Sequence, residues 1–82
     1  MINRSIALAR TITAKEAAEF VELCAGFESE VYIQKPELKI NAKSLMGVIS
    51  IALKAGQEVV VIASGGDEGD ALESAAAYLT EM

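Results

Sequence analysis

The sequence predicts an α+β fold of two layers, in which three helices cover one face of a mostly antiparallel four-stranded sheet. Two observations predict it. Four short segments have the apolar alternation or the β-branched composition of strands, and three others have the start signals or the apolar spacing of helices. They follow in the order strand, helix, strand, strand, helix, strand, helix. Because no repeat, low-complexity run or linker interrupts them, residues 1–82 are expected to form one domain.

The first strand is expected over residues 2–9, where Ile6 and Leu8 alternate with smaller residues. Arg4 falls on the same side and is expected at the fraying start of this strand. The pattern T-x-x-E of Thr13 and Glu16 is that of a capping box, which predicts the start of the first helix.

The first helix is expected to run to about Ala25 and to stop at Gly26. Its inward stripe consists of Ala17, Phe20, Cys24 and Phe27, with Val21 beside them and Glu19 and Glu22 facing outward. Cys24 is interpreted as a core residue, because a reactive thiol needs an exposed and electropositive setting.

A hairpin is expected next. Residues 31–35 and 38–41 alternate apolar and polar side chains, and Pro36 favours a tight turn between them. Ser44 is then a good N-cap for a second helix, expected to end near Ala55 with Gly56 as its stop.

The β-branched run over residues 58–63 predicts a central strand with apolar contacts on both faces. Residues 64–68 are interpreted as a turn, because their two glycines match no phosphate-binding pattern and acids follow them. A last helix is expected from Asp70 to about Thr80, with acids at its positive end. Its buried face consists of Leu72, Ala75, Ala76 and Leu79.

Composition excludes several function classes. The net charge of −5 argues against nucleic-acid binding, and the absence of histidine excludes imidazole chemistry. With one cysteine and no C-x-x-C pair, neither a disulfide nor a metal site is expected. No long apolar run or leader is present, so the protein is expected in the cytoplasm, without membrane contact. No nucleophile, base and orienting group assemble, so we expect neither an enzyme nor a cofactor.

The second helix is apolar nearly all round. Val48 and Ile51 share one face, whereas the remaining apolar side chains, Leu45, Met46, Ile49 and Leu53, point mostly elsewhere. A domain of this size cannot easily bury a short helix on all sides. Either the helix leaves an apolar patch exposed for a partner, which we favour, or it packs unusually deep.

These residues resemble the HPr family, the small phosphocarriers of the bacterial sugar phosphotransferase system. Residues 43–50, K-S-L-M-G-V-I-S, are close to the family's K-S-[IL]-M-G-V-M-S around its regulatory serine. Residues 11–17 lie where the family has G-I-H-A-R-P-A, and residues 64–68 and 71–72 resemble its last loop and helix start. The resemblance spans the whole chain and implies the family's open-faced β-sandwich, in the order βαββαβα.

The chain departs from the family at the phosphoryl-carrying site. By the resemblance, Thr13 replaces the carrier histidine, Lys15 the arginine and Glu16 the proline. A threonine phosphate ester is far more stable than phosphohistidine and is not readily passed on. Lys15 lacks the planar fork that suits a phosphoryl group, and Glu16 repels it. We therefore predict that the protein does not carry phosphate.

The serine site remains. The resemblance implies phosphorylation of Ser44 by an ATP-dependent serine kinase and binding to a transcriptional regulator of carbon use, as in family members that lack the histidine. A phosphate on Ser44 would lie at a helix start, which favours it. The expected partner surface consists of Lys43, Leu45, Met46, Ile49 and Leu53. The alternative is an interaction module of another pathway with Ser44 only a helix cap; a monomer or weak dimer suits both.

Overall fold

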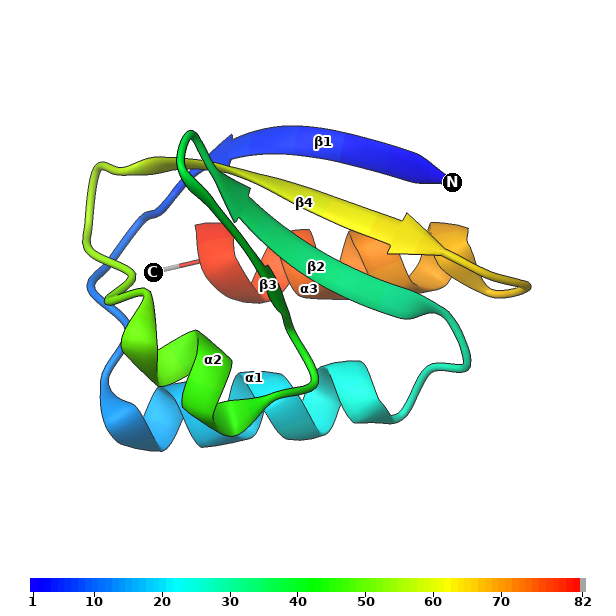
Figure 1. Ribbon diagram of the computed structural model, residues 1–82, viewed down its shortest axis with the longest axis horizontal. Coiled ribbons are helices and arrows are strands. Elements are labelled where there is room, and N and C mark those ends of the chain that lie inside the picture. The colour runs from blue at the N-terminus through cyan, green and yellow to red at the C-terminus, as the bar shows by residue number, and fades with distance from the viewer. Residues whose placement is uncertain (82) are drawn as a thin grey trace.

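The computed structural model describes residues 1–81 and shows a four-stranded antiparallel sheet with three helices on one face (Figure 1). The elements are β1 (Ile2–Ala7), α1 (Ala14–Ala25), β2 (Glu30–Lys35), β3 (Leu38–Asn41), α2 (Leu45–Ser50), β4 (Glu58–Ser64) and α3 (Glu68–Thr80). The predicted fold class and the element order βαββαβα are confirmed.

The sheet has the strand order β1-β4-β2-β3, so the β-branched segment β4 is central, as predicted. Val59, Val61 and Ala63 of β4 are buried towards the helices, because alternate side chains of a strand point to one face. Ile62 is buried on the opposite face. Lys35 pairs with Leu38, which leaves the predicted two-residue turn between β2 and β3.

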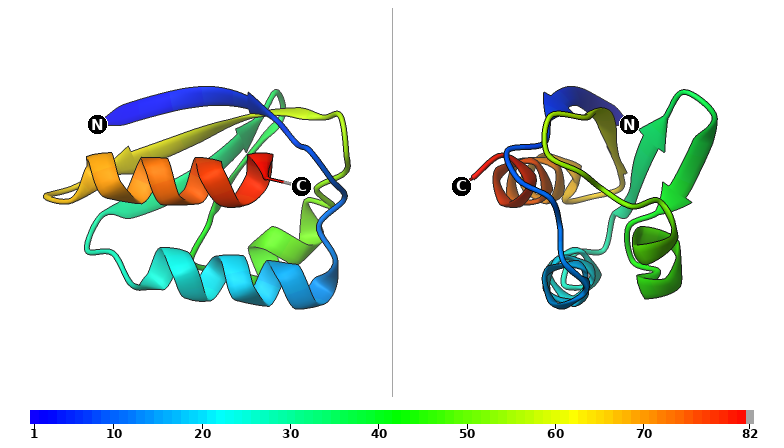
Figure 2. Two further views of the ribbon diagram at one scale, coloured as in Figure 1. Left: turned by 180° about the vertical axis from the view of Figure 1, so that it is seen from behind. Right: turned by 90° about the vertical axis from the view of Figure 1, so that its left-hand side faces the viewer.

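The core lies between the sheet and the helices, which share one side of it (Figure 2). Phe20 of α1 is completely buried, and its ring centroid lies 5.7 Å from that of Tyr78 on α3. The expected inward residues of α1 and α3 are buried, with Phe27 partly so: Ala17, Phe20, Cys24, Leu72, Ala75, Ala76 and Leu79. The two apolar stripes predicted from sequence therefore face the core.

Several element boundaries differ from prediction. β1 ends at Ala7, and Arg4 lies within it, opposite Val61, where it forms an ion pair with Glu73 of α3. Arg4 therefore joins a strand to a helix rather than fraying. α3 begins at Glu68, two residues before the predicted start at Asp70. The loop turn at residues 65–68 leads directly into the first turn of the helix, where the Ala71 N–H donates to the Asp67 carbonyl.

The second helix is much shorter than predicted: α2 ends at Ser50 and does not reach Gly56. The chain leaves the helix at Ala52, whose φ of 51° is left-handed. The carbonyl of the next residue, Leu53, then accepts a hydrogen bond from the Ile12 backbone N–H at 2.9 Å. This contact with a distant segment ends the helix where the sequence shows no glycine.

The turn before α3 is fastened to the loop after α1. The Asp67 carboxylate accepts hydrogen bonds from the backbone N–H groups of Glu28 and Ser29, both at 2.9 Å, and from the Ser29 hydroxyl. These bonds, the Ser29 hydroxyl first, lower the pKa of Asp67. Gly65 has a φ of 153°, and a Cβ on it would lie 2.6 Å from Ser29 Cα. The junction therefore requires glycine at residue 65.

We expect Gly65→Ala to destabilise the fold by about 1–3 kcal/mol, because its methyl group would displace the Ser29 backbone. Chemical denaturation measures the change. Gly66→Ala is the matched control, since its Cβ would meet only the flexible end of Glu28, at 3.9 Å. Equal stability of the two variants would contradict this account of the junction.

Candidate functional site

Ser44 begins α2 as predicted. Its hydroxyl accepts a hydrogen bond from the Gly47 N–H at 3.2 Å, while its own N–H donates to the Asn41 carbonyl at 3.0 Å. The Asn41 side chain also accepts from the Lys43 N–H at 2.8 Å. Asn41 at the end of β3 thus fixes the turn into the helix, and Ser44 remains on the surface.

The other end of α2 is held by side chains. The Ser50 hydroxyl donates to the Gly47 carbonyl at 2.8 Å, and the Lys35 ammonium donates to the Ile51 carbonyl at 3.2 Å. A positive charge at the carbonyl end of a helix is favourable, because the carbonyl dipoles point towards it. These contacts give a six-residue helix a fixed position on the domain.

Only one face of α2 enters the core. Val48 and Ile51 are buried, whereas the exposed fractions of Leu45, Met46 and Ile49 are 40%, 79% and 46%. Of the two predicted arrangements, the structure therefore shows the exposed one. We call Leu45, Met46 and Ile49 the α2 patch.

Leu53 does not belong to the α2 patch, and its prediction as a partner contact is wrong, since only 2% of its surface is exposed. The reason is the end of the helix at Ser50. After the left-handed turn at Ala52, the chain directs Leu53 into the core. A continuous helix would have placed it outside.

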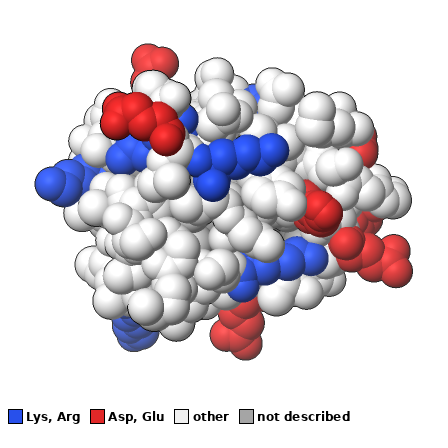
Figure 3. All heavy atoms as spheres, in the orientation of Figure 1, with Lys and Arg blue, Asp and Glu red and all other residues white. Residues whose placement is uncertain are grey.

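The lysines gather around the α2 patch. All five come from segments that adjoin α2: the first turn of α1, the β2–β3 hairpin and the connections at either end of α2. Most of the acids lie instead on α1, α3 and their loops. Figure 3 shows the face that carries β3 and α2, where a broad uncharged area is bordered by both blue and red side chains. Although the protein has a net charge of −5, all its lysines therefore lie in the neighbourhood of α2.

The Lys43 ammonium is directed away from Ser44. It donates to the Phe27 carbonyl at 2.7 Å, just beyond the end of α1. Near it lies Cys24, which is buried as predicted, and this burial raises the pKa of the Cys24 thiol to about 12. The thiol is therefore protonated and unreactive at neutral pH.

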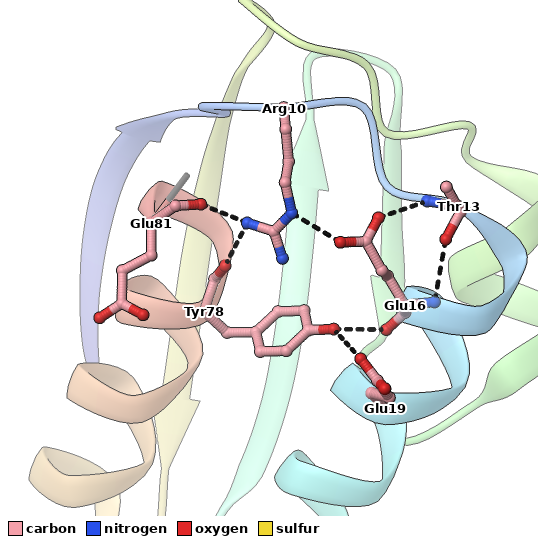
Figure 4. A network of polar contacts seen from close by, with 6 residues as sticks. All are labelled: Arg10, Thr13, Glu16, Glu19, Tyr78 and Glu81. Atoms are coloured by element: carbon pink, nitrogen blue, oxygen red, sulfur yellow. Dashed lines mark hydrogen bonds and ion pairs between the residues drawn. The ribbon is translucent and has the colours of Figure 1, made fainter.

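The start of α1, where the sequence places Thr13, is closed by its own residues. The Thr13 hydroxyl accepts from the Glu16 N–H at 3.2 Å, and the Glu16 carboxylate accepts from the Thr13 N–H at 3.1 Å. The predicted capping box is thus confirmed. The other carboxylate oxygen of Glu16 accepts from Arg10 Nε at 2.7 Å (Figure 4). Lys15 stays exposed beside this box.

Arg10 joins the start of α1 to the end of α3. Its guanidinium donates to the carbonyls of Tyr78, at 3.0 Å, and Glu81, and lies 5.1 Å from the centroid of the Tyr78 ring. The Tyr78 hydroxyl donates to the Glu16 carbonyl at 3.1 Å and to the Glu19 carboxylate at 2.8 Å. Sequence reasoning missed this network, because Arg10 and Tyr78 lie 68 residues apart.

A small hollow of about 80 Å³ lies between α1 and α2. Thr13 lines it at the start of α1 and Ile49 lines it on α2, together with Leu53, whereas Ser44 is not among the lining residues. No charged side chain lines the hollow. Within residues 1–81, no cluster of histidine, cysteine and acidic residues could hold a metal ion, and no helix is long and apolar enough to cross a membrane.

An open-faced sandwich with a serine-capped apolar helix defines the class of small HPr-type domains. The family model described as the PTS HPr component phosphorylation site matches residues 3–81. The chain therefore belongs to the HPr family, as its sequence predicts.

Two similar proteins are HPr-like proteins Crh. The chain is 47% identical to Crh of Bacillus subtilis (strain 168) over 70 residues, or 85% of this chain and 82% of that protein. It is 40% identical to Crh of Halalkalibacterium halodurans over 68 residues, or 83% and 81% of the two chains.

Solved structures show the same fold. The phosphocarrier protein HPr from Bacillus anthracis matches with a TM-score of 0.91 at 31% identity, over 96% of each chain. A crystal structure of Bacillus subtilis Crh, described as an intertwined dimer with a swapping domain, has a TM-score of 0.79 at 44% identity, over 90% of this chain and 85% of that one.

The burial of Leu53 predicts opposite results for two apolar residues of the α2 region. Leu53→Ala should lower the free energy of unfolding by about 2–5 kcal/mol, because it leaves a cavity in the core. Met46→Ala should change it by less than about 0.5 kcal/mol, because Met46 is exposed. Urea denaturation measures both, and a stable Leu53→Ala variant would contradict the assigned packing.

Glu16 should contribute to the acid dependence of stability. The hydrogen bond from Arg10, followed by that from the Thr13 N–H, lowers the pKa of Glu16 in the folded protein. A lowered pKa stabilises the fold above the unfolded value and loses this effect as pH falls through the folded one. The melting temperature of Glu16→Gln should therefore lie below wild type near neutral pH and approach it between about pH 5 and pH 3.

Glu22→Gln is the matched control for this measurement, because Glu22 lies on the exposed side of α1 and outside the network. If the melting temperature of Glu22→Gln also lies below wild type near neutral pH and approaches it as pH falls, the effect is one of net charge alone.

Proposed function

We propose that this protein is a regulatory, non-catalytic member of the HPr family that acts through Ser44 and the α2 patch and does not carry phosphate. The observation that supports this proposal most is the contrast between its two helix starts. Both cap residues are exposed, but at α1 the Glu16 carboxylate is bonded to the cap and held by Arg10, while at α2 the serine adjoins an exposed apolar patch.

The loss of the carrier role follows from chemistry at residue 13. No histidine is present to form a labile phosphoryl bond. The Thr13 hydroxyl and N–H are both bonded to Glu16, and the Glu16 carboxylate places a negative charge where an incoming phosphoryl group would dock. Arg10 holds that carboxylate in place at 2.7 Å. Repulsion and occupied donors therefore both oppose phosphoryl transfer to this position.

The α2 patch supports a protein partner. Met46 is 79% exposed although apolar, and its neighbours Leu45 and Ile49 extend the surface. Lysines around it favour a partner with an apolar centre and an acidic rim, because interfaces commonly pair an apolar core with a complementary charged periphery. The partners we propose are a serine kinase and a transcriptional regulator of carbon use, in the cytoplasm.

A second function is an interaction module of another pathway, with Ser44 only a cap. The hydrogen bond from Gly47 to the Ser44 hydroxyl supports it, because that bond stabilises α2 without any modification. Either function is compatible with a monomer or a weak dimer. A Crh structure is described as a dimer, so self-association through exchanged segments belongs to the same proposal.

Ser44 should be phosphorylated by the ATP-dependent serine kinase of an HPr system, because its hydroxyl is exposed beside the docking patch. Mass spectrometry of the intact protein and its peptides measures the added phosphoryl group. Ser44→Ala should abolish it. Ser50→Ala is the matched control on the same helix and should leave it unchanged, because the Ser50 hydroxyl donates to the Gly47 carbonyl.

Absence of modification in the wild-type protein would favour the second function. The loss of the carrier role has a separate test with labelled phosphoenolpyruvate. Transfer of a labelled phosphoryl group to residue 13 and from there to an acceptor would contradict it.

A further inference from the structure

Gly47 lies inside α2, at the third helical position after Ser44. Its φ is not positive, so its backbone is one that any residue adopts. A glycine inside a helix is less favourable than alanine, because it loses more conformational freedom on folding. The backbone of a helix of only six residues therefore gives no reason for glycine at this position.

α1 shows that a side chain is tolerated at the equivalent position. In both helices the cap hydroxyl accepts a hydrogen bond of 3.2 Å from the N–H three residues later. In α1 that residue is Glu16, whose side chain returns over the cap to bind the Thr13 N–H. In α2 the corresponding N–H, that of Ser44, is already bonded to the Asn41 carbonyl. The two caps differ in what stands beside the hydroxyl.

The space that Gly47 leaves open is the space beside the Ser44 hydroxyl. A Cβ on Gly47 would lie 3.3 Å from Ser44 Oγ and 3.4 Å from Ser44 Cβ, with the Asn41 carbonyl next at 3.7 Å. A longer side chain there would begin beside the hydroxyl, as the Glu16 side chain begins beside Thr13 before it returns to the Thr13 N–H.

We propose that Gly47 is a specificity-determining residue that keeps the Ser44 hydroxyl open to phosphoryl transfer. This inference rests on the proposed function of Ser44. In the transfer, Ser44 Oγ forms a bond to the γ-phosphorus of ATP, the bond from that phosphorus to the β,γ-bridging oxygen breaks, ADP leaves, and the hydroxyl proton passes to a base of the kinase. The attacking oxygen must be approached in line with the bond that breaks, which requires clear space beside it.

The hydroxyl proton of Ser44 is not held by an internal acceptor, in contrast to those of two other serines. The Ser50 hydroxyl donates to a helix carbonyl, and the Ser29 hydroxyl donates to Asp67. Within residues 1–81, Ser44 Oγ accepts one hydrogen bond but has no acceptor for its own proton. Its proton is thus available to a base, and Gly47 leaves the oxygen approachable.

The test compares Gly47→Ala and Gly47→Glu with wild type in the same kinase reaction, followed by mass spectrometry of residue 44. Gly47→Glu gives α2 the side chain that α1 has at its third helical position. We expect about a tenfold or larger loss of rate for Gly47→Ala and no detectable modification for Gly47→Glu, because small displacements of a reacting atom cost large factors in rate. The melting temperatures of both should equal or exceed that of wild type.

Gly69→Ala is the matched control for helix propensity. Gly69 lies in α3 with no atom within 4 Å of its added Cβ, so its substitution should leave the phosphorylation rate unchanged. Both Gly47 variants should still compete with wild type for the kinase, since the α2 patch is retained.

Phosphorylation of folded Gly47→Ala and Gly47→Glu at the wild-type rate would overturn the inference while leaving the role of Ser44 intact. Failure of the variants to compete would assign the loss to docking and would also overturn it. If the kinase does not modify the wild-type protein, both the proposed function of Ser44 and this inference are contradicted.

Discussion

The left-handed turn at Ala52 determines what the second helix can present to a partner. Because α2 stops at Ser50, only Val48 and Ile51 of the helix region enter the core before the chain turns back and buries Leu53. A non-glycine residue in this conformation costs about 1 kcal/mol. The hydrogen bonds of Lys35 to Ile51 and of Ile12 to Leu53 offset that cost and hold the short helix with its remaining apolar side chains outside.

The starts of α1 and α2 are held in different ways. On one side, Arg10 ties Glu16 to the last carbonyls of α3, so the start of α1 is part of the structural frame of the domain. On the other, within residues 1–81, the hydrogen bonds of Ser44 are to its own helix and to the end of β3. A site that is cross-linked to a distant helix resists change, while one held locally can accept a new group without disturbing the core. In the proposed function, the lost phosphoryl-carrying role belongs to the cross-linked start of α1, and the retained regulatory role belongs to the locally held Ser44.

Periodicity and local capping were sufficient to predict the element order, the hairpin turn, the α1 capping box and the buried stripes of α1 and α3. These features depend on residues a few positions apart. The end of α2 could not be predicted, because the sequence offers Gly56 as the stop while the structure turns at Ala52 through a contact with Ile12. The prediction that Leu53 is an exposed partner contact was wrong for the same reason, since its position depends on where α2 ends. The Arg10–Tyr78 and Asp67–Ser29 contacts join residues 68 and 38 positions apart, for which a single sequence carries no signal.

In a serine-capped helix start, the cap residue helps to form the helix, and a different residue leaves the cap hydroxyl open. Thr13 and Ser44 make the same hydrogen bond to the third helical N–H, so capping alone cannot distinguish them. The third residue does, because its side chain either returns to the backbone N–H of the cap residue, as that of Glu16 does, or is absent, as at Gly47. Opening the α1 cap would still not restore a carrier, since a threonine ester holds its phosphoryl group. In the proposed function, the residue at the third position controls access to the hydroxyl, and the residue at the cap determines whether an attached phosphoryl group can be passed on.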